Sequence, residues 1–548
     1  MEIKDSPLYS PDLAPVSEKL KHWNKWNMAA LWVGMAVCIP TYILASYMIR
    51  SGLSWQASMV IIGLANLIIT VPMVLNGHAG VKYGLPFPVI GRSVFGIKGI
   101  HLVAMVRGIV ACGWFGVQTW VGGLAILSII NTFTGGSGPQ ELLKFVCFGL
   151  FWLINIYFVW NGTESIRKLE DWSAPILIII GLLLLLWGYR QGGSISAVLK
   201  AGSQLQEKTV VKFDSAGQSY LKLNLLRDDK GRPRAKEFCI LKESEGPQEW
   251  HIIPENRIFL LPSTEEKVLQ LQFRTGKTLS SVVTAEEMPA GSSQLWAYLL
   301  WFTAMVGFWA TMSISISDIT RFARSQQDQV AGQFLGLPGT MLFYSFTGIF
   351  VTFASLAAFP DVLTGEDAPW DPVNLVSRFS NPWVVVFAQV SMLIATLSTN
   401  IAANIIAPAY AFSNLAPGKI SFRQGGVLAG IIGIATCPWW LLDEISHVLL
   451  FISGLLGPVL GILLCDYFHV KRMKLSLTEL FDPEGPYAFG GSGINAKAMI
   501  SMLAGVLVAL IGYWIPSFSF LFSLSWFTGF GLSYGLYFLL TGTEKKEQ

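Results

Sequence analysis

The stretch Ala395-Thr396-Leu397-Ser398-Thr399-Asn400-Ile401-Ala402-Ala403-Asn404 lies inside an apolar run that covers residues 382–412. A run of this length is sufficient for a membrane-spanning helix, which needs roughly 20 residues. Ala395, Ser398 and Thr399 share one face of such a helix, and Asn400 and Asn404 are again four residues apart. Polar side chains are costly in lipid, so the stretch predicts a membrane helix whose polar residues point into the protein.

Similar apolar runs recur along the whole chain. The roughly 20-residue criterion gives about twelve of them, at residues 28–50, 55–76, 101–130, 142–162, 171–189, 294–316, 333–359, 382–412, 423–442, 445–468, 495–515 and 518–541. Of the 548 residues, 52% are hydrophobic and 13% are charged, about half the charged fraction of a soluble domain. Uninterrupted runs of this length exclude a transmembrane β-barrel. The sequence therefore predicts an all-α integral membrane protein.

The charged residues predict an orientation and exclude one class of partner. A net charge of +3 gives no case for nucleic-acid binding. Basic residues favour the cytoplasmic side of a membrane. They lie in the N-terminal segment and in alternate loops, at Lys19, Lys21, Lys25, Lys82, Arg92, Lys98, Lys471, Arg472 and Lys474. We therefore expect a multi-pass protein of the cell (plasma or inner) membrane, in the lipid bilayer, with residues 1–27 and 542–548 both cytoplasmic.

Residues 203–290 differ from the rest of the chain. They are polar, and apolar residues alternate with polar ones in Leu221-Lys222-Leu223-Asn224-Leu225 and in Leu269-Gln270-Leu271-Gln272-Phe273. This period of two is typical of β-strands. The pattern predicts a small β-rich insertion between the fifth and sixth spans, on the extracytoplasmic side. Binding a partner, covering the substrate entry and folding without a further role all stay open for it.

Two spans contain features that interrupt a membrane helix. Residues Trp32 to Pro40 include Gly34 and Pro40, which free backbone carbonyls where a helix lines a cavity, although a lone Gly or Pro more often only kinks a helix. The sixth span has an aromatic pair beside Gly307, followed by polar residues up to Asp318. We expect interrupted helices at both places.

The third span carries an indole and an amide on one face. Trp114 and Gln118 are four residues apart, and an indole beside an amide suits a flat ring with donors and acceptors on its edge. A hydrogen bond between helices is the alternative reading of Gln118. Arg107 lies deep in the same span, and we expect its side chain to extend to the cytoplasmic interface.

Several motifs, in order, resemble those of the nucleobase–cation symport family 1, which includes hydantoin, allantoin, uracil and cytosine permeases. The matching stretches are Pro11 to Pro15, Gly80 to Val89, Arg92 to Gly96, Trp114 to Trp120, Trp309 to Asp318 and Ser398 to Asn404. The resemblance covers nearly the whole chain outside the insertion. It implies two inverted five-helix repeats of the leucine-transporter type, at residues 28–190 and 294–468, with two further helices at 495–541.

The resemblance also implies roles for individual residues. For a small planar heterocyclic substrate it implies contacts with Trp114, Gln118, Phe308, Trp309 and Asn404. A cation would be held by main-chain carbonyls of Gly34, Val37 and Ala395 and by the hydroxyls of Ser398 and Thr399. Leu456 would act as a gate over the substrate. Phe308 departs from the hydantoin carrier, which has a glycine there, so hydantoin itself is in doubt.

These features predict a cation-coupled symporter of a nucleobase or ureide ring that works by alternating access. No nucleophile–base pair is visible in the sequence, so we expect no enzyme activity and no cofactor; the coupling ion is Na⁺, a metal ion held at the cation residues, or H⁺. Two alternatives stay open: an amino-acid or amine carrier of the same fold, and a membrane receptor that uses the inserted domain. The particular heterocycle and the oligomeric state are open as well.

Overall fold

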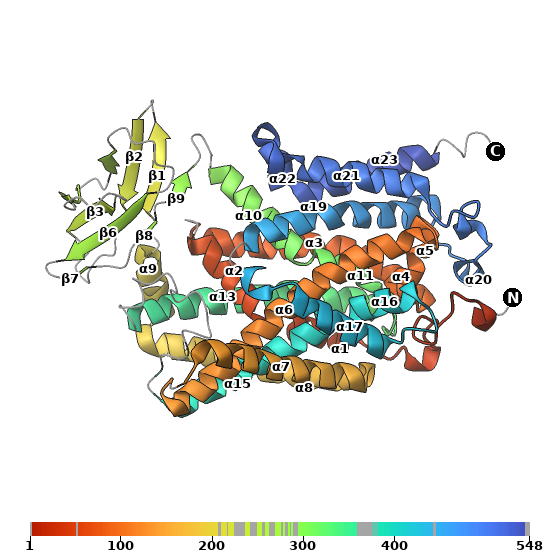
Figure 1. Ribbon diagram of the computed structural model, residues 1–548, viewed down its shortest axis with the longest axis horizontal. Coiled ribbons are helices and arrows are strands. Elements are labelled where there is room, and N and C mark those ends of the chain that lie inside the picture. The colour runs from red at the N-terminus through yellow and green to blue at the C-terminus, as the bar shows by residue number, and fades with distance from the viewer. Residues whose placement is uncertain are drawn as a thin grey trace.

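The structure, a computed structural model, describes residues 3–542 except 51–52, 137, 206–209, 216–217, 224–235, 242–248, 255–257, 262–268, 276–277, 280–282, 285, 289–293, 359–375, 377–378, 380 and 442–444. Long helices lie roughly side by side in one bundle (Figure 1). The N-terminal residues and the end of α23 (Ser525–Gly542) lie at one end of this bundle, which we call the terminal end. The tail at 543–548 lies outside the described residues.

The first half of the bundle is formed by the helices that precede the insertion. These are α1 (Lys25–Ala36), α2 (Ile39–Arg50), α3 (Trp55–Tyr83), α4 (Phe87–Ile90), α5 (Arg92–Phe95), α6 (Gly99–Thr134), α7 (Gln140–Asn161), α8 (Thr163–Gly192) and α9 (Ile195–Leu205). Local sequence sets several of their ends. Asn24 and Asn27 form a reciprocal capping box at the start of α1, and Gly84 ends α3 in a left-handed conformation with φ of 67°.

The second half follows the insertion. Its helices are α10 (Gln294–Phe308), α11 (Ala310–Ser315), α12 (Ser317–Thr320), α13 (Gln326–Ala358), α15 (Pro382–Asn404), α16 (Ile406–Leu415), α17 (Phe422–Ala435), α18 (Pro438–Leu441), α19 (Ile445–Leu464), α20 (Leu477–Leu480), α21 (Ala496–Trp514), α22 (Ser519–Ser523) and α23. A π-helical turn, Cys465–Val470, extends α19.

Within the described residues, nine helical stretches are long and apolar enough to cross a membrane. The other three expected spans are helical but divided. The first is split between α1 and α2, the ninth between α17 and α18, and the twelfth between α22 and α23. The all-helical membrane fold is therefore confirmed, whereas the number of twelve spans is not.

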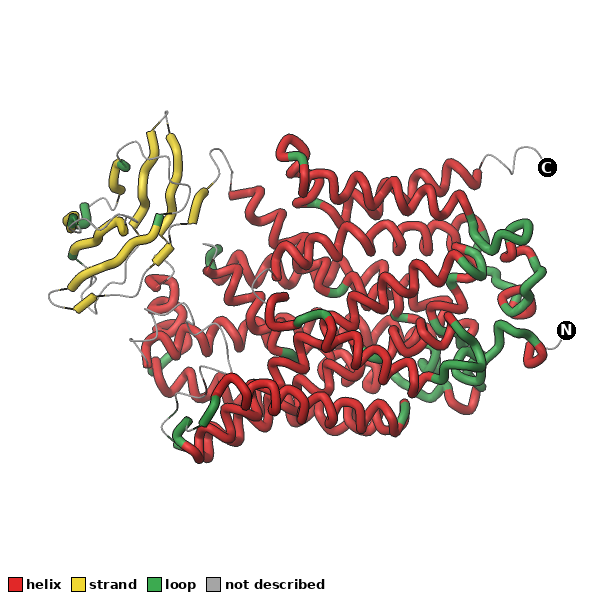
Figure 2. Tube along the Cα trace, viewed as in Figure 1, coloured by secondary structure: helices red, strands yellow, loops and turns green. Residues whose placement is uncertain are grey.

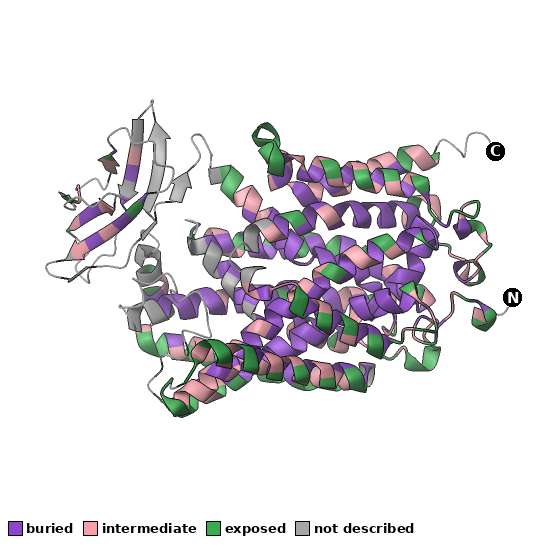
Figure 3. Cartoon of the chain, in the orientation of Figure 1, coloured by how far each residue is buried: buried purple, intermediate pink, exposed green. Residues whose placement is uncertain are grey.

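Burial separates an apolar outer surface from a polar interior. The outer helices carry many exposed residues (Figure 3). Leu153 of α7 and Leu507 of α21, for example, are each 59% exposed. Polar side chains of the central helices are buried, with Asn400 at 0% and Gln118 at 2%. This is the arrangement expected when lipid surrounds the bundle and polar groups find partners inside it.

The insertion forms two small sheets at the end of the bundle opposite the terminal end (Figures 1 and 2). Its strands are β1 (Val210–Ser215), β2 (Gln218–Leu223), β3 (Glu237–Leu241), β4 (Trp250–Ile252), β5 (Ile258–Leu260), β6 (Gln270–Thr275), β7 (Thr278–Leu279), β8 (Val283–Thr284) and β9 (Glu286–Met288). The strand orders are β5-β2-β1-β9 and β4-β3-β6-β7, and β8 also pairs with β6. The predicted β-rich nature is confirmed, and Leu221, Leu271 and Phe238 belong to a separate apolar core.

Candidate functional site

The predicted break in the first span is confirmed, and it lies at Val37 and Cys38, between α1 and α2. Val37 has a non-helical ψ of 79°. Pro40 is the second residue of α2, where the missing N–H of proline does not break the helix. The break therefore leaves main-chain carbonyls at the end of α1 without helical partners.

Those carbonyls face the polar side of α15. The hydroxyl of Thr399 donates to the carbonyl oxygens of Gly34 at 3.0 Å, Met35 at 3.2 Å and Val37 at 3.5 Å. Ala395, one turn earlier on α15, shares an apolar cluster with Val37. The hydroxyl of Ser398 accepts a hydrogen bond of 3.1 Å from Ser173 of α8. All five predicted cation-site residues therefore lie where the α1–α2 break meets α15.

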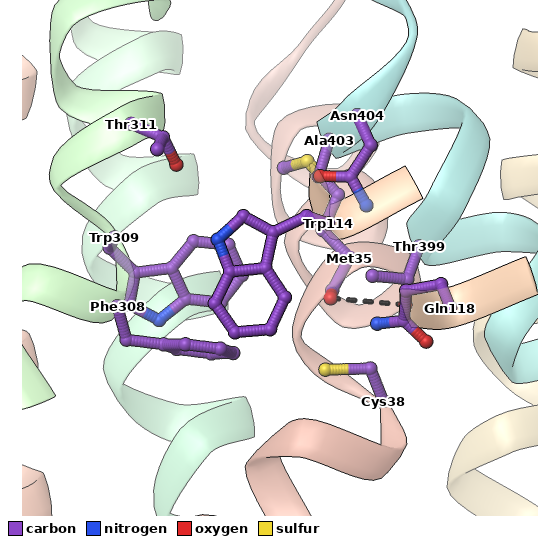
Figure 4. A pocket seen from close by; sticks show the side chains of 10 residues that line it. All are labelled: Met35, Cys38, Trp114, Gln118, Phe308, Trp309, Thr311, Thr399, Ala403 and Asn404. Atoms are coloured by element: carbon purple, nitrogen blue, oxygen red, sulfur yellow. Dashed lines mark hydrogen bonds between the residues drawn. The ribbon is translucent and has the colours of Figure 1, made fainter. Parts of the chain in front are cut away.

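The predicted substrate residues surround one cavity beside this junction. Trp114 and Gln118 of α6, Phe308 and Trp309 at the end of α10, and Asn404 at the end of α15 all line it (Figure 4). The remaining lining residues are Met35, Cys38, Thr311, Thr399 and Ala403. Thr399 and Cys38 connect the cavity directly to the broken first span. The cavity measures about 30 Å³, so it holds little more than water in this conformation.

Aromatic rings close one side of the cavity. The ring of Phe308 meets the Trp114 indole edge-to-face at 5.7 Å between centroids, and it meets the Trp309 indole at 5.0 Å. Trp309 in turn packs edge-to-face on Trp32 of α1 at 5.1 Å. Phe308 thus contacts both indoles at once, and Figure 4 shows its ring lying beneath them in the view.

Trp309 lies at the predicted break in the sixth span. It separates α10 from α11 and has φ of −102° and ψ of 4°. The break is therefore confirmed although no proline marks it. A second discontinuity follows at Ile316, between α11 and α12. Just before it, Asn76 of α3 donates to the carbonyls of Ser313 at 2.8 Å and Ile314 at 2.8 Å, which gives these buried acceptors partners outside their own helix.

Amide groups form the opposite side of the cavity. The Oε1 atom of Gln118 is buried and has no hydrogen-bond partner within the described part of the chain. The Nε1 atom of Trp309 is in the same situation. Asn404 donates through Nδ2 to Oδ1 of Asn400 at 3.1 Å. Buried polar atoms usually have partners, so these side chains are suited to meeting polar groups of a bound molecule.

A family model described as a permease for cytosine/purines, uracil, thiamine and allantoin matches residues 15–216 and 276–535. The chain belongs to this permease family. An allantoin permease of Bacillus subtilis is 30% identical over 98% of this chain and 95% of its own length. A purine-uracil permease of Arabidopsis thaliana is 32% identical over 93% of this chain and 72% of its own.

Solved structures show the fold of the permease. Mhp1, a nucleobase-cation-symport-1 family transporter in a closed conformation with bromovinylhydantoin bound, has a TM-score of 0.69, at 21% identity over 98% of this chain and 96% of its own. A Na⁺-coupled sialic acid symporter has a TM-score of 0.55, at 11% identity over 95% and 90%. The expected family and the leucine-transporter-type fold are both confirmed. The relatives are transporters and not enzymes.

The position of Arg107 in the permease differs from the expectation. Its side chain is 1% exposed and does not extend to the interface. Its Nε donates to the carbonyl of Thr311 at 2.6 Å and to the Ser315 hydroxyl at 3.1 Å, and one Nη donates to the carbonyl of Ala403 at 3.3 Å. The prediction was wrong because helix breaks in the sixth and eighth spans supply carbonyl acceptors at the depth of Arg107.

The predicted gate residue lies outside the cavity lining, and several residues of the site were not predicted. Leu456 is buried in α19 at 1% exposure but is not among the residues that line the cavity. Sequence reasoning missed Met35, Cys38, Thr311 and Ala403 of the cavity and Ser173, the partner of Ser398. Met35 and Ala403 are apolar residues in apolar runs and carry no signal. The hydroxyls of Ser173 and Thr311, each within an apolar span, were the available hints.

Proposed function

We propose that the permease carries a small planar nitrogen heterocycle of the nucleobase or ureide class by cation-coupled alternating access. One observation carries the proposal. Trp114 and Trp309 from different spans share a cavity with the amides of Gln118 and Asn404. Allantoin, uracil, cytosine and hydantoin are the candidates, and the names of the relatives support this range.

The site residues have complementary roles in this proposal. Indole faces supply flat apolar contact for the ring, and the two amides pair with donors and acceptors on its edge. Because the cavity is about 30 Å³, a ring enters only if side chains move apart. Phe308 packs against both indoles, so a ring that moves either indole also moves Phe308. Closure follows when the ring binds the closed state more tightly than the open one.

The cation is held at the junction of α15 with the broken first span. Carbonyls of Gly34, Val37 and Ala395 together with the hydroxyls of Ser398 and Thr399 form an oxygen-rich set, as expected for Na⁺ at an unwound helix. Thr399 also lines the substrate cavity. A cation that draws the Thr399 hydroxyl away from the α1 carbonyls therefore changes the substrate site, and by reciprocity the substrate changes cation affinity.

The remaining assignments follow from the same model of transport. Leu456 of α19 acts as the gate over the substrate. The terminal end of the bundle is cytoplasmic and the inserted sheets are extracytoplasmic, in a cell membrane. An amino-acid carrier would capture a carboxylate with main-chain groups, and the two indoles in the cavity favour the heterocycle instead.

Uptake into liposomes tests the proposal. Purified permease would be given radiolabelled allantoin, uracil, cytosine, hydantoin and an aromatic amino acid under an imposed Na⁺ gradient, an imposed H⁺ gradient or neither. We expect accumulation of at least one heterocycle under one gradient and none of the amino acid. Accumulation of the amino acid alone, or no gradient-driven uptake of any ring, would overturn the proposal.

A further inference from the structure

Behind Asn404, away from the cavity, the permease contains a hydrogen-bonded chain of buried polar side chains that has no role in the transport mechanism described above. It consists of Asn400 of α15, Thr119 of α6 and Asn155 of α7, and each is 0% exposed. None of the three lines the cavity. A buried amide or hydroxyl is costly unless its hydrogen bonds are made, so the direction of every hydrogen bond in this chain is constrained.

Two backbone carbonyls anchor the chain. Asn155 donates through Nδ2 to the carbonyl of Phe151 at 2.8 Å, and the Thr119 hydroxyl donates to the carbonyl of Phe115 at 2.6 Å. A carbonyl only accepts hydrogen bonds. The single hydroxyl proton of Thr119 is therefore committed, and the Asn155 amide is fixed with its nitrogen toward Phe151. Each residue consequently presents an oxygen acceptor to Asn400.

Asn400 must then turn its nitrogen toward these acceptors. Its Nδ2 donates to Asn155 Oδ1 at 3.1 Å, to Thr119 Oγ1 at 3.1 Å and to the Phe115 carbonyl at 3.3 Å. Flipping the amide would place its oxygen against three acceptors. The Asn400 oxygen thus faces Asn404 and accepts from Asn404 Nδ2 at 3.1 Å.

The same reasoning fixes the last amide. With its nitrogen held by Asn400, the Asn404 side chain keeps its oxygen for the cavity. Figure 4 shows that oxygen turned toward the Trp114 side and the nitrogen turned away from it. The orientation of Asn404 is therefore set by residues that lie one and two hydrogen bonds behind the substrate.

We propose that Asn400, held by Thr119 and Asn155, is a positioning residue that makes the cavity an acceptor at Asn404, so that the substrate must offer a ring N–H there. The substrate class is thereby narrowed to rings with a lactam, imide or ureide N–H at that edge, and a ring with oxygen in its place is rejected. The inference rests on the proposed function and refines its specificity.

The test compares pairs of ligands that differ in one atom. Of allantoin, uracil, cytosine and hydantoin, each ring that binds to the purified permease is compared with analogues in which one ring N–H is replaced by oxygen. We expect at least one replacement to weaken binding by roughly 10-fold or more, because two acceptors then face each other. In Asn400→Leu, the Asn404 amide is free to turn. The affinity of the N–H ring should then approach that of its oxygen analogue. The ratio of two affinities in one variant is insensitive to how much protein is folded.

Thr119→Val disturbs the hydrogen-bonded chain less than Asn400→Leu does, and it has a matched control in Thr70→Val. Thr119→Val removes one acceptor and should reduce the preference partly. Thr70→Val is the same change in α3, where Thr70 is 0% exposed and its hydroxyl donates to the Asn66 carbonyl at 2.6 Å, and it should leave the preference unchanged. If a ring binds but its oxygen analogues bind equally well, or if Asn400→Leu and Thr119→Val both keep the full preference, the inference is wrong while the proposed function stands. If none of allantoin, uracil, cytosine and hydantoin binds at all, the proposed pocket fails and the inference with it.

Discussion

At the scale of single residues, Gln118 is the side chain whose surroundings say most about binding. It is 2% exposed, and its Oε1 has no partner in the described structure. We expect Gln118→Ala to weaken heterocycle binding by about 1–3 kcal/mol, measured by titration of the purified permease. Gln333→Ala is the control, since Gln333 is a 0% exposed glutamine of α13 outside the cavity. If both variants bind the heterocycle with the same affinity, Gln118 does not hydrogen-bond the bound ring.

Thr399 makes a second prediction at this scale. Thr399→Val keeps the shape of the side chain but removes the hydroxyl that joins α15 to the carbonyls of Gly34 and Met35. We expect the permease to bind the driving cation more weakly, seen as a rise of roughly 10-fold or more in the cation concentration for half-maximal uptake rate.

The neighbouring residue provides the control for Thr399. Thr396→Val makes the same change three residues earlier on α15, where the hydroxyl of Thr396 is buried without a partner among the described contacts, so its cation dependence should stay as in the wild type. If Thr399→Val responds to cation like Thr396→Val, the cation site lies elsewhere.

How far single residues could be predicted depends on whether their partners are local. Trp114 and Gln118 share a helix face, so spacing alone indicated that they act together. The partners of Arg107 are carbonyls near helix breaks in two other spans, the sixth and the eighth. No spacing rule within the third span predicts these contacts. Asn400 was noticed in the sequence, but its role in fixing Asn404 depends on Asn155 of another helix.

At the scale of elements, the contact of α10 with α19 shows how closely the broken sixth span is packed. A Cβ atom added at Gly307 would lie 1.8 Å from the Ser453 hydroxyl and 2.9 Å from the Leu449 carbonyl. We expect Gly307→Ala to destabilise the permease by about 1–3 kcal/mol and to slow uptake, measured by thermal unfolding in detergent and by transport.

The control for this prediction comes from another long helix. At Gly339 of α13 an added Cβ meets nothing within 4 Å, so Gly339→Ala should be neutral or stabilise the helix by up to about 1 kcal/mol. A Gly307→Ala protein as stable and active as Gly339→Ala would contradict the close packing of α10 on α19.

Helix breaks were predictable where the sequence contains its own signal. Gly34 and Pro40 indicated the break in the first span, and the cluster of polar residues after Trp309 indicated the one in the sixth. The separation of α15 from α16 at Ile405 was not expected, because Ile405 is apolar and neither glycine nor proline. The local signal lies three residues further on: Pro408 has no N–H to donate to the carbonyl of Asn404, four residues earlier, and its ring crowds that carbonyl.

At the scale of the whole molecule, the inserted sheets form a unit apart from the helices. The family model leaves out residues 217–275, and the sheets have their own apolar core. We expect a permease in which residues 206–290 are replaced by a flexible Gly/Ser linker to transport with an unchanged half-saturating substrate concentration.

The same deletion distinguishes the alternatives for the insertion. A scrambled-sequence insert of equal length controls for spacing between α9 and α10. Loss of uptake in the deletion alone would mean that the sheets take part in transport. A receptor would show no uptake with or without the insertion, and it would lose its ligand response when the sheets are removed.

The central claim is that residues from the first, third, sixth and eighth spans converge on one cavity that receives the substrate. Cys38 lines that cavity, whereas Cys112 of α6 is buried in a separate apolar cluster. The most direct measurement is alkylation, by a small thiol reagent, of variants that retain only Cys38 or only Cys112, with and without a saturating transported ring. The account predicts that the ring slows modification of Cys38 and leaves Cys112 unchanged. Modification of Cys38 at the same rate with and without the ring would contradict it.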